Sequence, residues 1–540
     1  MSAGPNLEWW RGATLYHIYP RSFLDSTGDG VGDLQGITAK LDYVASLGVD
    51  GIWLSPFFRS PMKDFGYDVS DYIDVDPIFG TLTDFDALVE RAHQLDLKVI
   101  IDQVYSHTSD EHAWFQESRH SRRNPKADWY VWADAKEDGS PPNNWQSVFG
   151  GPAWTWDARR EQYYLHNFLA GQPDLNLYSG DVQAALHDVA RFWLDRGVDG
   201  FRLDAINFGM HDRELRDNPP SVAPYRSLSR PFLMQDQRFN LSRPDMPKAL
   251  ENLRSMLDTY GDVFTVAEIG GAEPLPTMRE YTLGDGRLNT AYGFEFLGLP
   301  ELTVEDIDRI LGSWPNGLNS GWPSWAFSNH DVSRAMSRWL DGAAHERRAE
   351  LLLLLLVSLR GNIFIYQGEE LGLTQAEIPF EQLRDPEAIA NWPHTAGRDG
   401  ARTPMPWESD ARYAGFSTAE PWLPVDTAHT ELAVGRQDGN GTSTLEKCRE
   451  LLKVRRTSPA LRAGDLEMLT AANGVLAFSR QLDGEQALCA FNISDEVRTW
   501  QPPNSPELLI VTSVGTATPG QPPPSTLEPY SGIIAMNGHG

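Results

Sequence analysis

The sequence predicts an α/β protein: a parallel (β/α)8 TIM barrel with an inserted subdomain after its third strand and a C-terminal antiparallel β-domain. Eight short runs rich in β-branched and aromatic residues alternate with longer stretches whose apolar residues recur at helical spacing. Near residue 460 the pattern changes, and short alternating runs replace the helices. The 540 residues are also enough for two or three domains.

Each candidate barrel strand is a short apolar run that ends near a polar residue. The eight runs are ATLYHIYP (13–20), GIWLSPFF (51–58), KVIIDQVYSH (98–107), GFRLDAI (200–206), FTVAEIG (264–270), AYGFEFL (291–297), SWAFSNHD (324–331) and NIFIYQGEE (362–370). The stretches GITAKLDYVASLG, TDFDALVERAHQLDL and VQAALHDVARFWLDRG between them predict helices. The run LLLLLLVSL at 351–359 predicts a buried helix, because a membrane span needs about 20 residues.

These elements divide the chain into four segments. Residues 1–104 and 177–460 form the two parts of the barrel, which residues 105–176 interrupt. That interruption is rich in Trp, Tyr, Asn, Pro and Gly and is too long for a plain loop, so we expect a subdomain. Residues 461–540 contain GVLAFSRQL and QALCAFNIS, which predict the C-terminal β-domain.

The composition excludes several classes of protein. A net charge of −29 would repel nucleic acids and anionic membranes, so we expect small neutral or cationic partners. Cys448 and Cys489 lack the spacing of a disulfide framework or a zinc site. The N-terminus shows no pattern of a signal peptide, so we expect a cytoplasmic protein, either a monomer or a homodimer.

Acidic residues lie at the ends of several predicted strands, where barrel enzymes place their chemistry. They are Asp102, Asp204, Glu268, Asp331 and Glu369, with His107 close to the first of them. Two carboxyl groups with different pKa values can act as nucleophile and acid in glycoside hydrolysis, although such a pair can also bind a divalent metal. Arg202 lies two residues before Asp204, on the same face of a strand, where its charge favours the ionised carboxylate. Taken alone, this pair is better interpreted as a structural one that ties the end of a strand to its neighbours.

The motifs DQVYSH, GFRLDAI, AEIG and FSNHD resemble, in order and spacing, the four signature regions of the α-amylase superfamily, glycoside hydrolase family 13. The resemblance implies that Asp204 is the nucleophile, Glu268 the general acid/base and Asp331 a third supporting carboxylate. It also implies that His107, Arg202 and His330 line the glucosyl subsite. Ser106 stands where the family usually has Asn, so the resemblance implies no amylase-type calcium site there.

Further motifs resemble those of the α-glucosidase and oligo-1,6-glucosidase subgroup: QPDLN (172–176), GYD (66–68) and GRDGARTPMPW (397–407). The resemblance implies that Asp68 and Arg398 clamp the terminal sugar, which makes the enzyme exo-acting, since charge-assisted hydrogen bonds close the end of the subsite. It also implies that Tyr67 and Phe168 form apolar platforms, although Phe168 could simply be a packing residue.

Ala205 follows the expected nucleophile and suggests the linkage that is cleaved. Relatives that favour α-1,6 bonds commonly have Val at this position, and those that favour α-1,4 bonds have Ala or Thr. A β-branched side chain would narrow the acceptor side of the subsite. The resemblance therefore implies α-1,4 disaccharides such as maltose as substrates.

The segment DSTGDGVGD (25–33) predicts a site for one structural divalent cation, Ca²⁺ or Mg²⁺, because acidic residues alternate with glycines as in the first half of an EF-hand loop. By resemblance, the ligands are the side chains of Asp25, Thr27, Asp29 and Asp33 and the carbonyl of Val31. An acidic turn without an ion is the alternative. No motif for an organic cofactor is visible, since Walker and dinucleotide-binding glycine loops are missing.

The sequence thus predicts a retaining α-glucosidase that transfers glucose to water and, through the same covalent intermediate, to alcohol or sugar acceptors. Three alternatives remain open: a sucrose-type hydrolase, a dedicated α-glucosyltransferase, and a non-catalytic amylase-like heavy chain. The last class carries a membrane anchor and loses catalytic carboxylates, whereas all three are present here.

Overall fold

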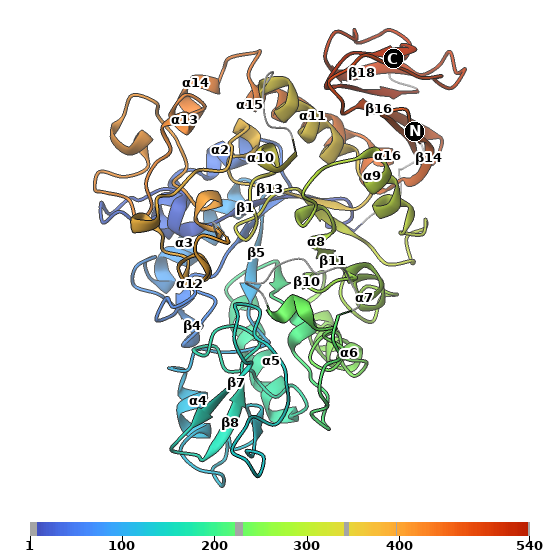
Figure 1. Ribbon diagram of the computed structural model, residues 1–540. Coiled ribbons are helices and arrows are strands. Elements are labelled where there is room, and N and C mark those ends of the chain that lie inside the picture. Colours follow the sequence, from blue (N-terminus) through green and yellow to red (C-terminus); the bar gives the residue numbers. More distant parts are fainter. Residues whose placement is uncertain (1–7, 222–230, 340–344, 396, 538–540) are drawn as a thin grey trace.

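The computed structural model describes residues 8–221, 231–339, 345–395 and 397–537. At its centre, eight parallel strands lie in the order β11-β10-β9-β5-β2-β1-β13-β12, and a bridge between Ala291 and Pro323 joins the two outer strands into a barrel (Figure 1). The strands are β1 (Thr14–Ile18), β2 (Gly51–Leu54), β5 (Lys98–Gln103), β9 (Gly200–Leu203), β10 (Phe264–Ile269), β11 (Thr290–Gly293), β12 (Ser324–Ala326) and β13 (Asn362–Tyr366). All eight predicted strands are confirmed.

Two of the predicted strands are shorter than expected. In AYGFEFL the strand ends at Gly293, and a helical turn, α8 (Phe294–Leu297), follows it. In SWAFSNHD the strand ends at Ala326, so the polar residues that follow lie in the loop above the barrel. Short strands of this kind leave the functional residues on loops while the strands hold their positions.

Helices surround the barrel and cover its outer face. They are α1 (Leu34–Ala39), α2 (Leu41–Ser46), α3 (Leu82–Gln94), α5 (Gly180–Leu194), α6 (Met246–Leu257), α7 (Pro274–Tyr281), α9 (Val304–Gly312), α10 (Ala335–Trp339), α11 (His345–Ser358) and α15 (Thr444–Thr457). The stretch 36–48, predicted as one helix, is divided at Lys40 into α1 and α2. Within the described residues, no helix is both long enough and apolar enough to cross a membrane.

Two different cores stabilise the barrel. The interior is filled by large side chains of neighbouring strands, among them Leu15, Trp53, Ile100, Val266, Tyr292 and Phe364. The outer core lies between the strands and the helices and includes the run of leucines in α11, which is buried as predicted. Because side chains alternate along each strand, one set points into the interior of the barrel and the other set points outward to the helices.

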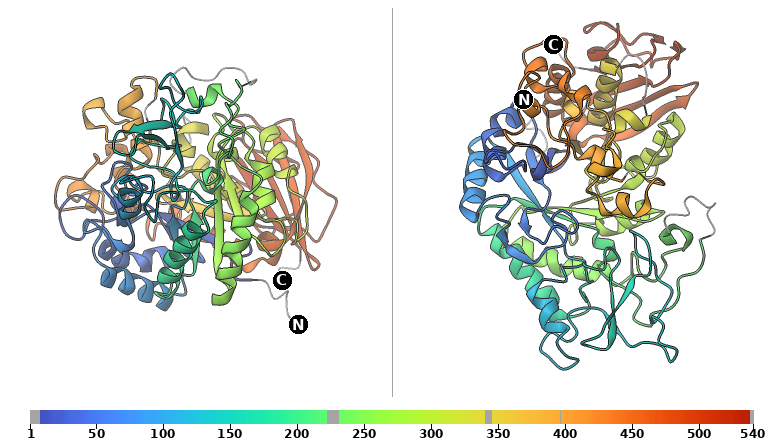
Figure 2. Two further views of the ribbon diagram at one scale, coloured as in Figure 1. Left: turned by 90° about the horizontal axis from the view of Figure 1, so that it is seen from below. Right: turned by 60° about the vertical axis from the view of Figure 1, so that its left-hand side comes forward.

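The long segment after β5 forms a separate lobe, seen at the bottom of Figure 1 and again at the bottom of the right-hand view in Figure 2. It contains α4 (Ala113–Ser118) and a three-stranded antiparallel sheet of β6 (Trp132–Ala133), β8 (Gln162–Leu165) and β7 (Trp154–Asp157). A bridge between His107 and Asp174 ties the two ends of the segment together beside the barrel. The lobe therefore stands at the end of the barrel where the strands finish.

A five-stranded antiparallel sheet ends the chain, on the opposite side from the inserted lobe (Figures 1 and 2). Its strands are β14 (Asp465–Ala472), β15 (Val475–Leu482), β16 (Glu485–Asn492), β20 (Ser531–Met536) and β18 (Leu509–Val514). Helix α11 packs closely against this sheet, since a Cβ on Gly532 would lie 2.8 Å from Cδ2 of Leu354 and would displace that side chain. The predicted C-terminal β-domain is confirmed.

The remaining elements are short. They are β3 (Phe58–Arg59), β4 (Asp71–Val75), α12 (Pro386–Asn391), α13 (Thr427–Thr430), α14 (Val434–Gln437), α16 (Pro459–Ala463), β17 (Arg498–Thr499) and β19 (Thr526–Leu527). The first seven residues, which form part of the segment searched for a signal peptide, lie outside the described residues.

Candidate active site

Strand β9 explains why charged residues stand among apolar ones in GFRLDAINF. Phe201 and Leu203 are fully buried in the outer core, so the alternation of the strand turns Arg202 inward. Asp204 follows the strand on the same side. Ala205 then takes a left-handed conformation with a φ of 39°, and a 3-10 helical turn begins at Ile206. This sharp turn places Asp204 at the mouth of the barrel.

Arg202 is the electrostatic centre of the site. Its Nη1 lies 2.6 Å from Oδ1 of Asp102 and 2.5 Å from Oδ1 of Asp204, and its Nη2 lies 2.7 Å from Oε2 of Glu268. Its side chain is fully buried, and a buried charge requires such partners. The parallel register, which pairs Arg202 with Asp102 on β5, brings these groups to one level of the barrel. The carboxylates predicted from separate motifs are therefore neighbours.

Three carboxylates around one guanidinium cannot all ionise easily in a buried site. Burial raises the pKa of Asp204, Glu268 and Asp102 to about 7, although the charge of Arg202 opposes this shift for each of them. Repulsion from Asp331 adds to the increase for both Asp204 and Glu268. The cluster thus retains protons near neutral pH, which is the property that acid catalysis by a carboxyl group requires.

Glu268 is held by two groups besides its ionic neighbour, Arg202. The backbone N–H of Ala205 donates to Oε2 at 3.0 Å, and the hydroxyl of Tyr292 on the adjacent strand donates to Oε1 at 3.1 Å. The same hydroxyl accepts from Nε and Nη2 of Arg202, at 3.1 and 2.9 Å. The side chain keeps 7% of its exposure, so the carboxyl group remains reachable from outside.

Asp331 lies on the loop after β12 and bridges the central cluster to two further arginines. Its Oδ1 is 2.9 Å from Nη2 of Arg402 and 3.5 Å from Nη1 of Arg398, and its Oδ2 is 3.2 Å from Nε2 of His330. Burial and the charge of Arg402 lower the pKa of His330 well below its usual range. His330 is therefore neutral and serves as a hydrogen-bonding group.

Arg398 forms ion pairs with two buried acidic residues, Asp64 and Asp385. Its Nη2 lies 2.8 Å from Oδ1 of Asp64 and 2.8 Å from Oδ1 of Asp385, and all three side chains are buried. Burial raises the pKa of Asp385, but the charge of Arg398 outweighs it and brings the value to about 2. Asp385 therefore stays ionised and fixes the guanidinium.

Asp68 instead orders its own loop. Its Oδ1 accepts from the backbone N–H of Asp64 and the hydroxyl of Ser60, both at 2.9 Å, and its Oδ2 accepts from the N–H of Lys63 at 2.8 Å. The structure shows no ion pair between Asp68 and Arg398, and the assignment of Asp68 to the terminal sugar stays a prediction. Positive φ angles at Phe65 and Gly66 turn the chain, so that Asp64 faces Arg398 while Asp68 faces the loop backbone.

Aromatic residues and histidines complete the wall of the site. The hydroxyl of Tyr67 lies 2.6 Å from Nε2 of His330, and the two rings are stacked within 2° of parallel. His107 lies 3.1 Å from both the backbone carbonyl of Tyr67 and Nε2 of Gln172. Phe168 is half-buried, with its ring 5.1 Å from that of His107. The structure therefore places Tyr67, His107, Phe168 and His330 side by side, and Asp68 follows Tyr67 in the chain.

The acidic loop at 25–33 shows another use of its carboxylates. Asp25 accepts from the N–H groups of Gly28 and Gly30, at 2.7 and 2.8 Å. Asp33 caps α1 through the N–H of Gly36, at 2.6 Å. Over the described part of the chain, no group of three or more acidic, histidine or cysteine side chains is placed to hold a metal ion. The oxygens at 25–33, which include the Thr27 hydroxyl and the Val31 carbonyl, suit a hard cation chemically, and the cation site stays a prediction.

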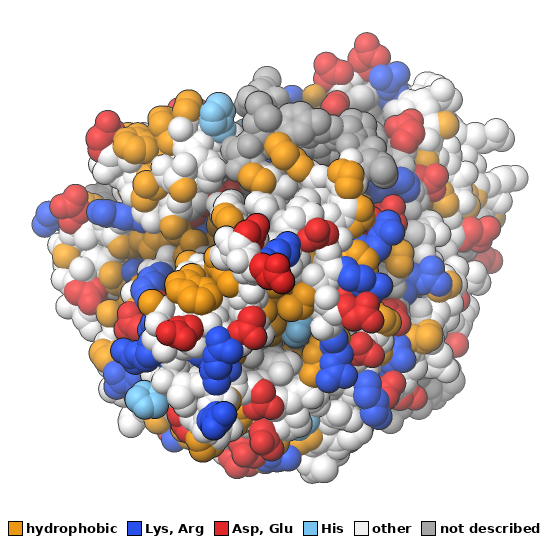
Figure 3. All heavy atoms as spheres, turned by 60° about the horizontal axis from the view of Figure 1, so that its bottom comes forward, with side chains coloured by type: hydrophobic (Ala, Val, Ile, Leu, Met, Phe, Trp, Pro, Cys, Tyr) orange, Lys and Arg blue, Asp and Glu red, His pale blue; other side chains and the backbone are white. Residues whose placement is uncertain are grey.

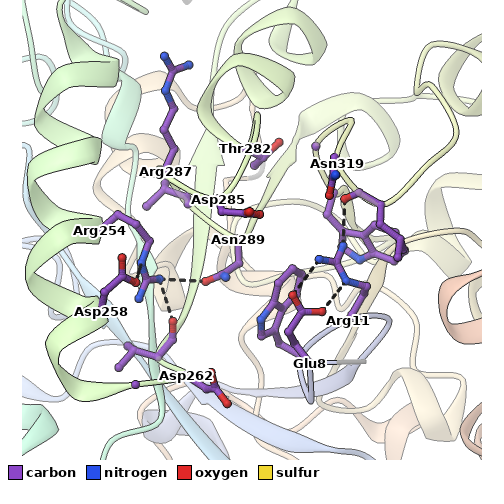
Figure 4. A pocket seen from close by; sticks show the side chains of 18 residues that line it. Glu8, Arg11, Arg254, Asp258, Asp262, Thr282, Asp285, Arg287, Asn289 and Asn319 are labelled. Atoms are coloured by element: carbon purple, nitrogen blue, oxygen red, sulfur yellow. Dashed lines mark hydrogen bonds and ion pairs between the residues drawn. The ribbon is translucent and has the colours of Figure 1, made fainter. Parts of the chain in front are cut away.

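A separate cavity of about 270 Å³ lies at the opposite end of the barrel (Figure 4). Its residues precede or begin the strands, as Val263 and Asn289 do. Figure 4 shows Arg254 directed at Asp258 and Asn289, and Arg11 directed at Glu8. These groups satisfy one another, so the cavity is distinct from the carboxylate cluster and shares none of its residues.

Several residues of the site were not identified from the sequence. They are Asp64, Gln172, Tyr292, Asp385 and Arg402. Three of them lie inside motifs that had been recognised, namely Gln172 in QPDLN, Tyr292 in AYGFEFL and Arg402 in GRDGARTPMPW. Their positions in those motifs were a usable signal. Asp64 and Asp385 lie outside the motifs, and only the folded chain brings them to Arg398.

Known proteins agree with this architecture. The family model described as α-amylase, catalytic domain, matches residues 17–464. A probable α-glucosidase from Rhizobium meliloti is 53% identical over 506 residues, which cover 92% of each chain. An oligo-1,6-glucosidase from Heyndrickxia coagulans is 36% identical over 98% of this chain and 99% of its own. The crystal structure of the α-glucosyl transfer enzyme XgtA superposes with a TM-score of 0.94 at 51% identity, covering 98% of this chain and all of the other.

The match extends through every strand of the barrel after the first three residues of β1, and the carboxylate cluster stands at the end of the barrel where such enzymes carry their chemistry. The chain belongs to the α-amylase family of glycoside hydrolases.

Proposed function

We propose that this enzyme is a retaining, exo-acting α-glucosidase that releases terminal α-1,4-linked glucose from short substrates such as maltose. The observation that carries the proposal is the contact of Arg202 with Asp204 and Glu268 together, at 2.5 and 2.7 Å. One buried cation favours an ionised nucleophile, while the mutual repulsion of the carboxylates favours a proton on the second group. The pair thus supplies both functions that the reaction needs.

In the first step, Asp204 attacks the anomeric carbon and the glycosidic C–O bond breaks as Glu268 gives its proton to the leaving oxygen. Arg202 holds Oδ1 of Asp204, so Oδ2 is the attacking oxygen. In the second step, ionised Glu268 takes a proton from water, and the water oxygen displaces Asp204 to give α-glucose. Glu268 must therefore be protonated and then ionised within each cycle, and a pKa of about 7 suits both states.

The exo-action that we propose rests on the buried network of Arg398. Asp64 and Asp385 hold this guanidinium, while Asp331 links it to the central cluster. We assign Asp64 and Arg398 to the hydroxyls of the terminal glucose, because charge-assisted hydrogen bonds at a buried end leave no space for a longer chain. His107, His330, Tyr67 and Phe168 would surround the same sugar.

The preference for α-1,4 linkages rests on Ala205, which lies in an apolar cluster with Phe208, Phe232 and Leu241, next to Phe168. Its small side chain leaves room on the acceptor side. A β-branched residue would narrow that room and would be strained at a φ of 39°.

Transfer of glucose to an acceptor is the second candidate for the main reaction. The similarity to an α-glucosyl transfer enzyme at 51% identity favours it specifically. Water and a sugar or alcohol hydroxyl would compete for the same covalent intermediate, so the acceptor side of the site decides the outcome.

One experiment tests these points together. The enzyme would be incubated with maltose, isomaltose, sucrose, trehalose or maltotriose, with and without an alcohol acceptor, and the products followed by NMR. We expect α-glucose as the first product, maltose as the preferred disaccharide, and glucosides of the added alcohol. β-Glucose as the first product would contradict retention, and internal cleavage would contradict exo-action. Loss of hydrolysis without acceptor would make transfer the main function.

A further inference from the structure

Tyr292 lies opposite the expected acid/base on the neighbouring strand. In the parallel register of β10 and β11, Glu268 pairs with Tyr292, so both side chains enter the barrel interior at one level. Tyr292 is 1% exposed, and its ring packs against those of Trp53 and Phe364, at 6.1 and 5.6 Å between ring centres. Its hydroxyl is therefore held rigidly beside the carboxyl group of Glu268.

The hydrogen bonds around this hydroxyl define its direction. Nε and Nη2 of Arg202 both donate to the Tyr292 oxygen, at 3.1 and 2.9 Å, and occupy its lone pairs. Burial raises the pKa of Tyr292 well above its usual range, so the phenol keeps its proton. The hydroxyl can then only donate, and its acceptor is Oε1 of Glu268, 3.1 Å away.

We propose that Tyr292 is a positioning residue that transmits the charge of Arg202 to Oε1 of Glu268 and stabilises the ionised form of this acid/base. The inference rests on the proposed function, since it assigns a role to a residue that acts through Glu268. A hydroxyl polarised by a guanidinium is a stronger donor than a free phenol. Tyr292 thus assists proton departure in the first step and keeps the base ionised for the second.

The other charged groups around Glu268 have opposite effects on its ionisation. Asp204 and Asp331 repel its negative charge, Asp102 adds negative charge across Arg202, and Arg202 attracts it at 2.7 Å through Oε2. Apart from Arg202, the N–H of Ala205 and the hydroxyl of Tyr292 are the donors that the structure places on this carboxylate. Removal of the hydroxyl therefore leaves Oε1 among negative groups without its donor.

The experiment replaces Tyr292 with phenylalanine, which keeps the ring and removes only the hydroxyl. We expect the alkaline limb of kcat/KM for maltose to move up by about one pH unit, because one hydrogen bond to an ionised group has that order of effect. The value at the optimum should fall about tenfold for maltose. It should fall less for 4-nitrophenyl α-glucoside, whose leaving group needs little help from an acid.

Tyr16→Phe is a matched control. Tyr16 is fully buried on β1 and donates to a carboxylate remote from the cluster, Oε1 of Glu370, at 2.7 Å. It therefore reports the structural cost of losing a buried bond between a phenol and a carboxylate. We expect a lower Tm in this variant and unchanged pH limbs.

If Y292F does not fold, 3-fluorotyrosine incorporated at position 292 provides the second measurement. Its phenol is more acidic and donates more strongly, so the alkaline limb should move to lower pH. The role of Tyr292 would be overturned if the alkaline limb of the pH profile did not move in any variant that folds. An equal loss of kcat/KM on maltose and on the nitrophenyl substrate would overturn it too. Absence of α-glucosidase activity in the unsubstituted enzyme would instead refute the proposed function.

Discussion

The assignment of Asp64, rather than Asp68, to the sugar clamp can be tested with two substitutions in one loop. Both carboxylates are buried, but Asp64 pairs with Arg398 at 2.8 Å, whereas Asp68 accepts from Ser60 and from backbone N–H groups. Breaking a buried ion pair costs about 3 to 5 kcal/mol. In D64N, Arg398 retains Asp385 at 2.8 Å, so the lower end of this range applies.

This cost lowers the stability of D64N, whereas the loss of a charge-assisted hydrogen bond to the sugar costs about 1.5 to 3 kcal/mol of transition-state binding. A loss of about 3 kcal/mol corresponds to about a hundredfold lower kcat/KM for maltose. D68N keeps one acceptor oxygen and loses hydrogen bonds within the loop, so we expect a change below about tenfold and a lower Tm. Steady-state kinetics with maltose and differential scanning calorimetry would measure both effects. A hundredfold loss of kcat/KM in D68N, with D64N near normal, would refute the assignment.

Three further predictions concern linkage, pH and the acidic loop. A205V should raise the ratio of isomaltose to maltose hydrolysis by about tenfold, measured as a ratio of kcat/KM values, and an unchanged ratio would remove the basis for the α-1,4 preference. Above pH 7, kcat/KM for maltose should fall about tenfold per pH unit, since burial raises the pKa of Glu268 to about 7 and its protonated form is lost as the pH rises. Activity that stays constant to pH 9 would exclude Glu268 as the acid. If the segment at 25–33 binds Ca²⁺, as its sequence predicts, a chelator should lower the Tm and added Ca²⁺ should restore it. D29N should abolish that difference, and identical melting curves with and without chelator would contradict the predicted cation site.

The barrel could be predicted from the sequence because its strands and helices leave patterns in short, continuous stretches of residues. Each strand is a short apolar run, each covering helix shows a helical period, and the eight alternations leave few topologies. The ends of the strands were less predictable. Phe294 to Leu297 alternate apolar and polar residues as a strand does, yet the pairing with β10 ends at Gly293 and they form the turn α8.

The predicted site depended on where each side chain points, which the sequence shows only inside a strand. Arg202 and Asp204 are two residues apart on one strand, so their common direction followed from the alternation. Glu369 was expected among the converging carboxylates. In the structure, the turn at Gly368, with a φ of 90°, directs it back to accept from the N–H of Tyr366 at 2.8 Å.

The contacts of loop residues could not be predicted from the sequence for a different reason. Asp64 and Asp68 are equally acidic and lie four positions apart, and only the positive φ angles at Phe65 and Gly66 decide which of them meets Arg398. Asp385 comes from a distant segment and contributes through its contact with the same guanidinium.

The surface on the side of the inserted lobe carries acidic and basic side chains interspersed with hydrophobic ones (Figure 3). Asp331, whose side chain is 23% exposed, is the most accessible of the clustered carboxylates, while those of Asp204 and Glu268 are 10% and 7% exposed. Asp204 and Glu268 thus lie deeper in the site than Asp331.

Covalent trapping tests the central claim, that Asp204 is the nucleophile of a retaining glucosidase, most directly. In Glu268→Gln, the acid/base is absent, so 4-nitrophenyl α-glucoside should form the glucosyl-enzyme faster than water removes it. Mass spectrometry of the digested protein should then show one added glucosyl group on the peptide that contains Asp204. No adduct, or an adduct on another carboxylate such as Asp331, would contradict the account.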